Sequence, residues 1–314
     1  YTTLFRSLMN IEVFSAAKKE TKLFTTASAV SVLTQEDLRR SGATCIPEAL
    51  RLVPGMHVAR IGSNRWAVTA RGFNEYYANK LLVMMDGRSV YSPIFSGVFW
   101  DQVDTLMEDI ERIEVIRGPG ATLWGANAVN GVVNIITKHA KDTQGWLMTG
   151  GGGDEERGFG SIRYGGGNGK DAHFRIYAKY HARDNFEYPM DEDVHDDWQL
   201  GSVGFRLDWE PGDRDHLMVE AEVHEGAFEY ERDHLSLTPP YEVRAEHDGE
   251  MSGGHFLARW EHALSATSDI QIQAYYDRGE RDMELANLGV DTFDLDLQHR
   301  FARSEEHTSE LQSL

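Results

Sequence analysis

The stretch from Asp109 to Lys138, DIERIEVIRGPGATLWGANAVNGVVNIITK, decides the fold of this chain. The β-branched residues between Ile113 and Ile116 predict a strand that ends at the turn Arg117–Gly120, where glycine and proline follow one another. After Gly131 a second run is apolar at consecutive positions, as in a strand that is buried on both faces. The glycines between the two runs suit a backbone that turns sharply or packs closely. The stretch therefore predicts a strand, a turn, a short compact segment and a second strand.

A phosphate-binding loop is the first functional alternative for this stretch. The segment Gly120–Gly125 has the glycine spacing of such a loop, but the motif continues with Lys and then Ser or Thr. Here Ala126 and Asn127 follow, so the chain offers neither a charge for a β-phosphate nor a hydroxyl for a magnesium ion. The dinucleotide-binding glycine pattern fails as well, and we favour a structural turn over a nucleotide site.

Three earlier motifs accompany this stretch: IPEALRLVPGM at Ile46–Met56, the tripeptide Arg71–Phe73, and LLVMMDG at Leu81–Gly87. In this order the four motifs resemble the plug domain of TonB-dependent outer-membrane receptors, over about Ile11 to His139. The resemblance implies an α+β plug domain followed by antiparallel strands of a transmembrane β-barrel. It also implies a location in the outer membrane of a Gram-negative bacterium, as a multi-pass β-barrel surrounded by outer-membrane lipid.

Composition narrows the class of protein. The chain has 314 residues, of which 41% are hydrophobic, and its mean hydropathy is −0.46. No apolar run approaches the roughly 18 residues of a membrane helix, so any membrane-spanning part would use strands of about 9–11 residues. The formal net charge of −20 argues against a nucleic-acid partner, which requires a basic surface.

Cysteine and histidine give no sign of a redox or metal centre. The single cysteine, Cys45, excludes an internal disulfide. The 13 histidines are scattered without HExxH or another paired ligand spacing, so we predict neither a metal site nor a cofactor. No acid–base pair or nucleophile stands in a recognisable catalytic motif, and we predict that the protein is not an enzyme.

Changes in composition and residue pattern divide the chain into segments. Residues 1–7 and 303–314 resemble translated sequencing-adapter oligonucleotides, and we exclude both from the fold argument. We predict a mobile N-terminal segment at 8–26, a plug domain at 27–140 and a partial β-barrel at 141–302. If the ends are adapter-derived, the natural sequence is truncated on both sides.

Beyond Lys138 apolar and polar residues alternate with a period of two, for example in His173–Lys179. Short turns such as Pro211–Arg214 alternate with long acidic connections at Asp184–Asp197 and Glu229–Gly254. A soluble sandwich shows the same alternation along its strands. Short turns on one side and long loops on the other are typical of outer-membrane barrels, which we therefore favour.

We count about eight strands in this part, whereas plugged transporter barrels have roughly 22. Eight strands cannot enclose a plug, so we expect an open, curled sheet with Thr292–Phe301 as a free edge. Aromatic residues near strand ends are expected at the membrane interfaces. These are Tyr180, Tyr188, Trp198, Trp209 and Trp260.

The N-terminal segment contains a short alternating stretch that can add as a strand to the sheet edge of a partner. By resemblance it is a possible TonB box, the stretch that contacts a TonB-type energy-coupling protein in the periplasm. Its residues are Ile11, Glu12, Val13, Phe14 and Ser15.

The resemblance places three plug loops on the outward side, at Arg60–Trp66, Asn74–Asn79 and Ser92–Trp100. Aromatic side chains in and beside these loops can hold a small chelate or macrocycle, while packing against the barrel wall is the alternative for about half of them. The candidate ligand-binding residues are Arg60, Asn64, Arg65, Trp66, Tyr76, Tyr77, Tyr91, Phe95, Phe99 and Trp100.

Two arginines are candidates for contacts between plug and barrel. Arg71 and Arg117 stand beside glycines at strand ends, and an arginine that faces a low-dielectric lumen needs a carboxylate. In the resembled family plug arginines pair with barrel acids, and here Glu220 and Glu222 are the candidates. Two solvated arginines are the alternative.

The resemblance implies active transport without bond chemistry. A ligand would dock on the outward loops, and a pull transmitted through the N-terminal segment would shift or unfold part of the plug. A ferric siderophore is the favoured ligand, and cobalamin, haem or a glycan stay open. A TonB-linked signalling receptor is an alternative, as is an isolated plug-like binding module if the chain is not a fragment.

Overall fold

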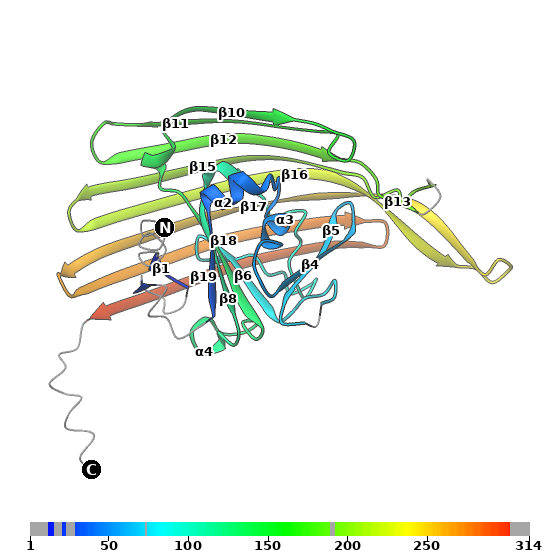
Figure 1. Ribbon diagram of the computed structural model, residues 1–314, viewed down its shortest axis with the longest axis horizontal. Helices are drawn as coiled ribbons and strands as arrows, with labels where there is room; N and C mark the ends of the chain where they lie inside the picture. Colours follow the sequence, from blue (N-terminus) through cyan, green and yellow to red (C-terminus); the bar gives the residue numbers. More distant parts are fainter. Residues whose placement is uncertain (1–11, 16–20, 23–28, 73, 189–191, 302–314) are drawn as a thin grey trace, which may run out of the picture.

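The computed structural model describes residues 12–15, 21–22, 29–72, 74–188 and 192–301. Its two layers are visible in Figure 1: a small α+β domain, the predicted plug, lies against the inner side of a curved sheet of long strands, the wall. The expectations for Ile11, for residues 1–7 and for residues 303–314 concern positions outside the described residues.

The plug is built on a five-stranded mixed sheet with the order β3-β8-β9-β6-β7. β6 and β9 run parallel, and the other neighbours run antiparallel. The strands are β3 Val30–Thr34, β6 Leu81–Met85, β7 Arg88–Ser89, β8 Ile110–Arg117 and β9 Gly131–Thr137. β6 is buried along its whole length because other elements cover both of its faces. The predicted strand, compact segment and strand within Asp109–Lys138 are confirmed as β8, the short helix α4 (Ala121–Trp124) and β9.

Two glycines of this stretch have the predicted roles. Gly118 has a φ of 141°, which side-chain-bearing residues rarely adopt. At Gly131 an added Cβ would lie 2.6 Å from the carbonyl oxygen of Ile116, so the close approach of β8 and β9 requires glycine there.

Two short helices pack on the plug sheet. A capping box starts α2 (Gln35–Ser41), where the Thr34 hydroxyl accepts from the N–H of Asp37 and the Asp37 carboxylate accepts from the N–H of Thr34. α3 (Ile46–Leu50) begins with Pro47 in its first turn. Among the described residues, no helix has the length and apolarity needed to cross a bilayer.

A hairpin of β4 (Met56–Gly62) and β5 (Arg65–Ala70) completes the plug. The prediction of a polar loop at Arg60–Trp66 is wrong, because strand pairing continues through Arg60 opposite Trp66 to Gly62 opposite Arg65. The pairing satisfies backbone groups that a loop would leave to water.

The wall is a single antiparallel sheet of eight strands, each paired with the next one in its order. Its strands are β10 Gly145–Gly151, β11 Gly158–Gly167, β12 Ala172–Arg183, β15 Trp198–Gly212, β16 Asp215–Leu235, β17 Glu242–Ser265, β18 Ser268–Met283 and β19 Ala286–Phe301. Within the described residues β10 and β19 are the two open edges, and β19 contains the expected edge Thr292–Phe301. A small ribbon of β13 (Glu187–Tyr188) and β14 (Glu192–Asp193) lies between β12 and β15.

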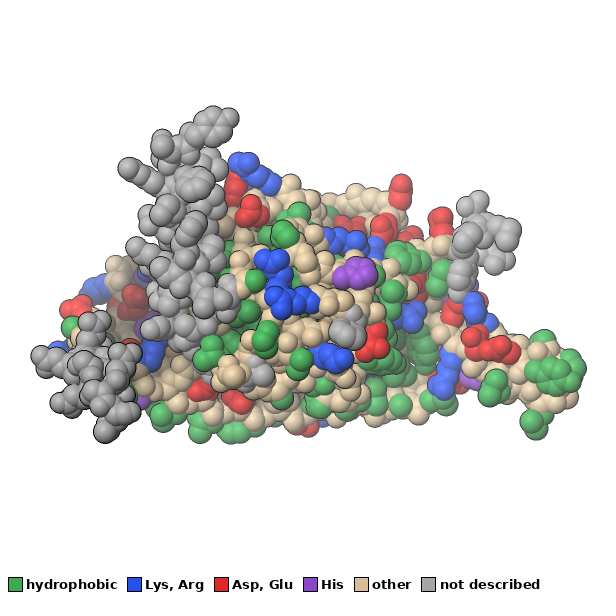
Figure 2. Space-filling model, turned by 60° about the horizontal axis from the view of Figure 1, so that its bottom comes forward, with side chains coloured by type: hydrophobic (Ala, Val, Ile, Leu, Met, Phe, Trp, Pro, Cys, Tyr) green, Lys and Arg blue, Asp and Glu red, His purple; other side chains and the backbone are tan. Residues whose placement is uncertain are grey.

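One predicted connection is wrong. The expected long loop Glu229–Gly254 is a continuation of β16 and β17, whose pairing extends to Leu235 opposite Glu242. The paired ends form an arm that projects at the right of Figure 1. Hydrophobic side chains cover the tip of this arm in Figure 2, where Leu235 and Leu237 are exposed. On the same end β18 and β19 are joined by Glu284–Leu285 alone, so long and short connections do not alternate strictly.

The wall is polar on the face toward the plug and apolar on the opposite face. Exposed apolar side chains form a row across neighbouring strands, interrupted only by Ala221. The row is Tyr164, Ile176, Phe205, Ala221, Phe256, Tyr276 and Phe293. The alternate residues Arg163, Arg175, Arg206 and Glu222 are buried. A soluble sandwich has the reverse arrangement, whereas a barrel in lipid requires an apolar outer band.

Four of the five predicted interfacial aromatics separate into two groups, and the side chain of the fifth, Tyr188, lies outside the described part of the structure. Tyr180, Trp209 and Trp260 are exposed near strand ends, as expected. Trp198 is 4% exposed and packs edge-on against Trp66 of the plug, with ring centroids 6.1 Å apart. Trp198 is therefore a core residue, and its prediction as an interfacial residue is wrong.

Candidate functional site

Aspartates of the plug face arginines and a lysine of the wall. The pairs are Asp86 with Arg206, Asp101 with Arg281, Asp104 with Lys179, and Asp109 with both Arg163 and Arg175. None of these side chains is more than 11% exposed. Removing one partner of a buried ion pair leaves an uncompensated charge, so these pairs hold the plug in one position against the wall.

Asp109 connects the start of β8 to two wall strands. Its carboxylate accepts a hydrogen bond from Arg163 of β11, and it lies 3.4 Å from Nε of Arg175 on β12. Arg175 also donates to the hydroxyl of Thr137, at 2.9 Å, and to the carbonyl of Lys138. The wall thus holds both ends of the stretch that decides the plug fold.

Asp104 makes a second buried contact with the wall. Nζ of Lys179 lies 2.6 Å from its carboxylate and donates to the carbonyl of Thr105 at 3.0 Å. Burial by itself raises the pKa of Asp104, but the charges of Lys179 and His181 outweigh burial and hold this pKa below its ordinary 3.8. The Asp104 carboxylate is therefore ionised at neutral pH.

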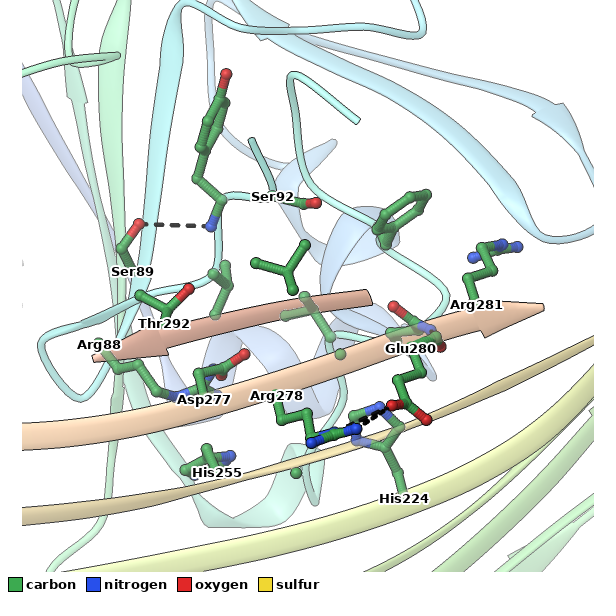
Figure 3. Close-up of a pocket in the computed structure, with 18 of the residues that line it drawn as sticks. Arg88, Ser89, Ser92, His224, His255, Asp277, Arg278, Glu280, Arg281 and Thr292 are labelled. Carbon is green, nitrogen blue, oxygen red and sulfur yellow. Dashed lines mark hydrogen bonds and ion pairs between the residues drawn. The ribbon is translucent and has the colours of Figure 1, made fainter. Parts of the chain in front are cut away.

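Two further pairs have the opposite polarity. Arg88 of β7 pairs with Asp277 of β18, and Arg60 of β4 pairs with Glu155 in the connection between β10 and β11. Figure 3 shows Arg88 beside Asp277 at a cavity of about 90 Å³ between the plug and the wall. Pockets for small molecules measure about 300–1,000 Å³, so this cavity is a gap in the interface and too small for a chelate or macrocycle.

The predicted pairs of Arg71 and Arg117 with Glu220 and Glu222 are wrong. Arg71 is exposed at the end of β5 and lies over Gly118, and Arg117 donates to the carbonyl of Pro54 at 2.7 Å. Glu220 instead faces His255, with Nε2 and Oε1 3.1 Å apart, and Glu222 accepts from the hydroxyl of Tyr177. Both arginines therefore contact the plug itself, and both glutamates have partners within the wall.

The plug aspartates were not predicted, although the sequence contained a signal for them. His173–Lys179 places Arg175 and Lys179 on one face of a strand, and buried cations on the inner face of a barrel require acids on whatever fills it. Asp101, Asp104 and Asp109 lie close together in the sequence, the first two just before the stretch Asp109–Lys138 and the third at its first position. Only the fold shows which acid meets which cation.

The described part of the N-terminal segment lies on the plug. Its residues Glu12–Val13 (β1) pair with Thr21–Lys22 (β2), and Val13 and Ser15 are fully buried. The segment was predicted to be mobile and to contact a TonB-type protein. The described residues of the segment are docked on the plug, which conceals Val13 and Ser15.

The carboxylate of Glu114 on β8 holds this segment. Glu114 is fully buried and accepts hydrogen bonds from the backbone N–H groups of Phe14, at 3.0 Å, and Ser15, at 2.7 Å. Arg112 Nε donates to the same carboxylate at 2.8 Å and balances its charge. Hydrogen bonds to a charged group are the stronger kind, so Glu114 acts as the main clamp on the segment.

Four of the predicted ligand residues come together on the plug beside Arg281 of β18. The rings of Tyr76, Tyr77, Phe95 and Phe99 form one cluster, with successive centroids 4.2–5.2 Å apart. Tyr77 is 55% exposed. Burial raises the pKa of Tyr76 to about 12, so the Tyr76 phenol is a neutral hydrogen-bonding group at physiological pH.

The predicted residues of the β4–β5 hairpin lie in a separate cluster. The N–H of Ser63 at the hairpin tip donates to the carboxylate of Asp196 at 2.7 Å, and Trp198 Nε1 donates to the carbonyl of Ser63 at 3.0 Å. The guanidinium of Arg60 lies 4.5 Å from the ring centroid of Phe186. The hairpin is thereby fastened to the long connection between β12 and β15.

The structure contradicts a surface role for part of the predicted ligand set. Asn64, Trp66, Phe95 and Trp100 are each less than 9% exposed, because they pack inside the plug or between plug and wall. Exposed or half-buried positions are occupied by Arg60, Arg65, Tyr76, Tyr77, Tyr91 and Phe99.

Comparison with known proteins agrees with the arrangement of a plug against a curved wall. The family model described as the TonB-dependent Receptor Plug Domain matches residues 22–132. The vitamin B12 transporter BtuB of Photobacterium profundum is 30% identical over 230 residues, which are 71% of this chain and 36% of the transporter. The iron-regulated outer membrane virulence protein of Vibrio cholerae is 37% identical over 124 residues, or 38% of this chain and 18% of that protein.

Solved structures share the fold. The pyoverdine outer membrane receptor FpvA of Pseudomonas aeruginosa superimposes with a TM-score of 0.67 at 18% identity, over 87% of this chain and 40% of the receptor. The chain thus spans well under half the length of these relatives. With its plug domain and part of a β-barrel, the chain belongs to the TonB-dependent receptors of the Gram-negative outer membrane.

Proposed function

We propose that the protein is an energy-coupled uptake receptor that imports a scarce ligand through the outer membrane. The observation that carries this proposal is the plug held against the polar inner face of the wall by buried ion pairs. A barrel wide enough for such a plug would leak without it. The plug must therefore move for a ligand to pass, and ion pairs can be broken and remade without bond chemistry.

The N-terminal segment is the proposed point of contact with a TonB-type protein in the periplasm. Its described residues are held on Glu114 through backbone N–H groups, and the Ser15 hydroxyl also accepts a hydrogen bond from the side chain of Asn134 at 3.0 Å. A partner that pairs with the segment as a strand competes for the same kind of backbone bond. Release from Glu114 would then transmit a pull to β8, which lies between β3 and β9 in the plug sheet.

A ferric siderophore is the proposed ligand, and Tyr76, Tyr77, Tyr91 and Phe99 are proposed to contact it. The likeness to FpvA, a receptor bound to pyoverdine in its solved structure, supports this choice. The half-buried phenols suit a chelate with both aromatic and polar surface. Cobalamin is the second candidate, because the vitamin B12 transporter BtuB matches over 71% of this chain.

Uptake by living cells tests the proposal. The full-length receptor would be expressed in a Gram-negative host that lacks its own siderophore and cobalamin receptors, with and without a functional TonB. We expect TonB-dependent accumulation of radiolabelled ferric siderophore. Accumulation of labelled cobalamin instead would support the second ligand, and accumulation of either ligand without TonB would overturn energy coupling.

A further inference from the structure

The outward end of the wall carries two histidines and a glutamate that take no part in holding the plug. His234 on β16, His247 on β17 and Glu284 in the β18–β19 turn each offer one ligand atom, and these three atoms lie within 4.8 Å of one another. Nε2 of His234 is 2.8 Å from Nε2 of His247. Oε2 of Glu284 is 3.1 Å from Nδ1 of His247 and 4.0 Å from Nε2 of His234.

Tyr230 fixes the position of this group. It stands opposite His247 in the pairing of β16 and β17, with ring centroids 5.4 Å apart, and its hydroxyl accepts from the N–H of Glu284 at 3.1 Å. Tyr230 also packs against the core that the plug shares with the wall. The group therefore lies on the inner side of the wall, at the outward end where a ligand would enter.

The atoms that converge here are good ligands for a transition metal. Two imidazoles and a carboxylate suit divalent ions such as Zn²⁺, which forms bonds of about 2.0–2.2 Å to nitrogen and oxygen. Neighbouring ligand atoms in a tetrahedral site of that size are about 3.4 Å apart. An imidazole binds one ion through a single nitrogen, and we assign Nε2 as the ligand atom of His247 because it faces Nε2 of His234. The separations of 2.8 Å between these two nitrogens and 4.0 Å between Nε2 of His234 and Oε2 of Glu284 lie on either side of this value, and small side-chain rotations would equalise them.

The burial of the three side chains fits such a site. The side chain of His247 is 13% exposed and is held by Tyr230, whereas those of His234 and Glu284 are 40% and 47% exposed. One rigid ligand and two adjustable ones allow the group to close around an ion from solution. A second group, His139, Glu210 and His216, is less suitable because His216 already bonds to Asp208, which also holds Arg206.

We propose that His234, His247 and Glu284 bind a divalent transition-metal ion, which clips the arm of β16 and β17 to the β18–β19 turn. The donors come from three separate elements, so no spacing in the sequence predicts the site. Metal binding would order the wall at the entrance above the plug. The inference is independent of the identity of the transported ligand.

Zinc binding by the full-length receptor tests this proposal. The protein would be purified from outer membranes in detergent, freed of metal with EDTA, and titrated with Zn²⁺ by isothermal calorimetry. We expect H234A and H247A each to bind one ion fewer than the wild type, and E284Q to bind that ion at least about 10-fold more weakly. His195→Ala is the matched control, because His195 lies at the same end with a side-chain exposure of 38% and pairs with Glu246.

Two further measurements separate metal binding from loss of folding. Each variant must keep the heat-modifiable gel mobility of a folded barrel, and His234→Gln provides a second, polar replacement. Zn²⁺ should also slow tryptic cleavage at the exposed Arg232 and Arg244 of the arm in the wild type and in H195A, but not in H247A. Equal binding and equal protection in the wild type, H234A and H247A would overturn the proposal.

Discussion

At the scale of single residues, most of the ion pairs that hold the plug have the acid on the plug and the base on the wall. The plug supplies buried aspartates, and the wall supplies arginine and lysine. In a low-dielectric interface the desolvation of each charge is large, so a pair stabilises the docked plug only while both partners are present.

Replacing Asp109 with Asn should strongly destabilise the receptor. The change leaves Arg163 and Arg175 buried without a carboxylate, which costs about 3–5 kcal/mol in the free energy of unfolding. Guanidinium unfolding of the purified receptor, followed by tryptophan fluorescence, measures this loss. Arg278→Ala is the control, because its pair with Glu280 has side chains 55% and 42% exposed and should contribute less than about 1 kcal/mol. Equal losses in the two variants would contradict the role of Asp109.

The contribution of Asp104 should persist at mildly acid pH. Because its pKa in the folded protein lies below the ordinary 3.8, its stabilisation is present above that value and is lost as pH falls through the folded pKa. The difference in melting temperature between the wild type and Asp104→Asn should thus be the same at pH 7 and pH 5, and shrink below about pH 4. A difference that has already disappeared at pH 5 would show that Asp104 is not held ionised by Lys179.

At the scale of elements, β8 combines two tasks. Asp109, directly before the strand, contacts the wall, and the middle of the strand holds the N-terminal segment through Glu114. One inner strand of the plug sheet, between β3 and β9, thereby connects the N-terminal segment, where the pull is proposed to act, to the contact with the wall.

Glu114→Ala should release the N-terminal segment. Val13→Cys, in a Cys45→Ala background, places a thiol at a buried position, and its rate of maleimide labelling reports exposure. Loss of charge-assisted hydrogen bonds of about 1.5–3 kcal/mol should raise that rate at least about 10-fold. Glu111→Ala on the same strand is the control, since Glu111 is exposed and should leave labelling unchanged. Similar rates in the two variants would remove Glu114 from this role.

The apolar outer face of the wall predicts a position-dependent cost for charge. Val223→Arg on β16 places a cation in the outer band and should cost about 2–4 kcal/mol, whereas Val243→Arg on the arm should cost less than about 1 kcal/mol. Both valines are exposed, so packing changes little in either variant. Folding of the full-length receptor into lipid vesicles over a urea series compares the two. Equal costs would mean that the band does not face lipid.

At the scale of the whole molecule, the charged side chains of the plug surface match those on the face of the wall that it contacts. The wall turns its charged side chains toward the plug because lipid accepts only the apolar face. In most of the ion pairs between them, the plug supplies the acid and the wall the base, and the pairs of Arg60 and Arg88 have the opposite polarity.

Exchanging the charges of one pair tests this mutual dependence. Asp101→Arg and Arg281→Asp should each destabilise the receptor, because each places like charges together in a buried contact. The double variant should recover about 1–3 kcal/mol relative to the sum of the single effects. Recovery is expected to be incomplete, since Arg281 also lies over the rings of Phe228 and Phe99. A purely additive double variant would show that the two residues do not interact.

The sequence by itself determined the local elements and the class of protein. The strand and turn pattern of Asp109–Lys138, the capping box at Thr34 and the buried strand Leu81–Met85 each depend on residues close together in the chain. Period-two alternation likewise predicted the strands of the wall. Such features follow from local conformational preference and from the periodicity of apolar residues.

Only the tertiary structure decided which face is which and which charges meet. Period-two alternation is the same in a soluble sandwich and in a barrel, and the plug position alone shows that the polar face points inward. Asp101 and Arg281 are 180 residues apart, so their contact depends on strand register and sheet curvature rather than on local pattern. For the same reason the partners of Arg71 and Arg117, the length of the arm and the meeting of His234 with His247 could not be predicted from the sequence.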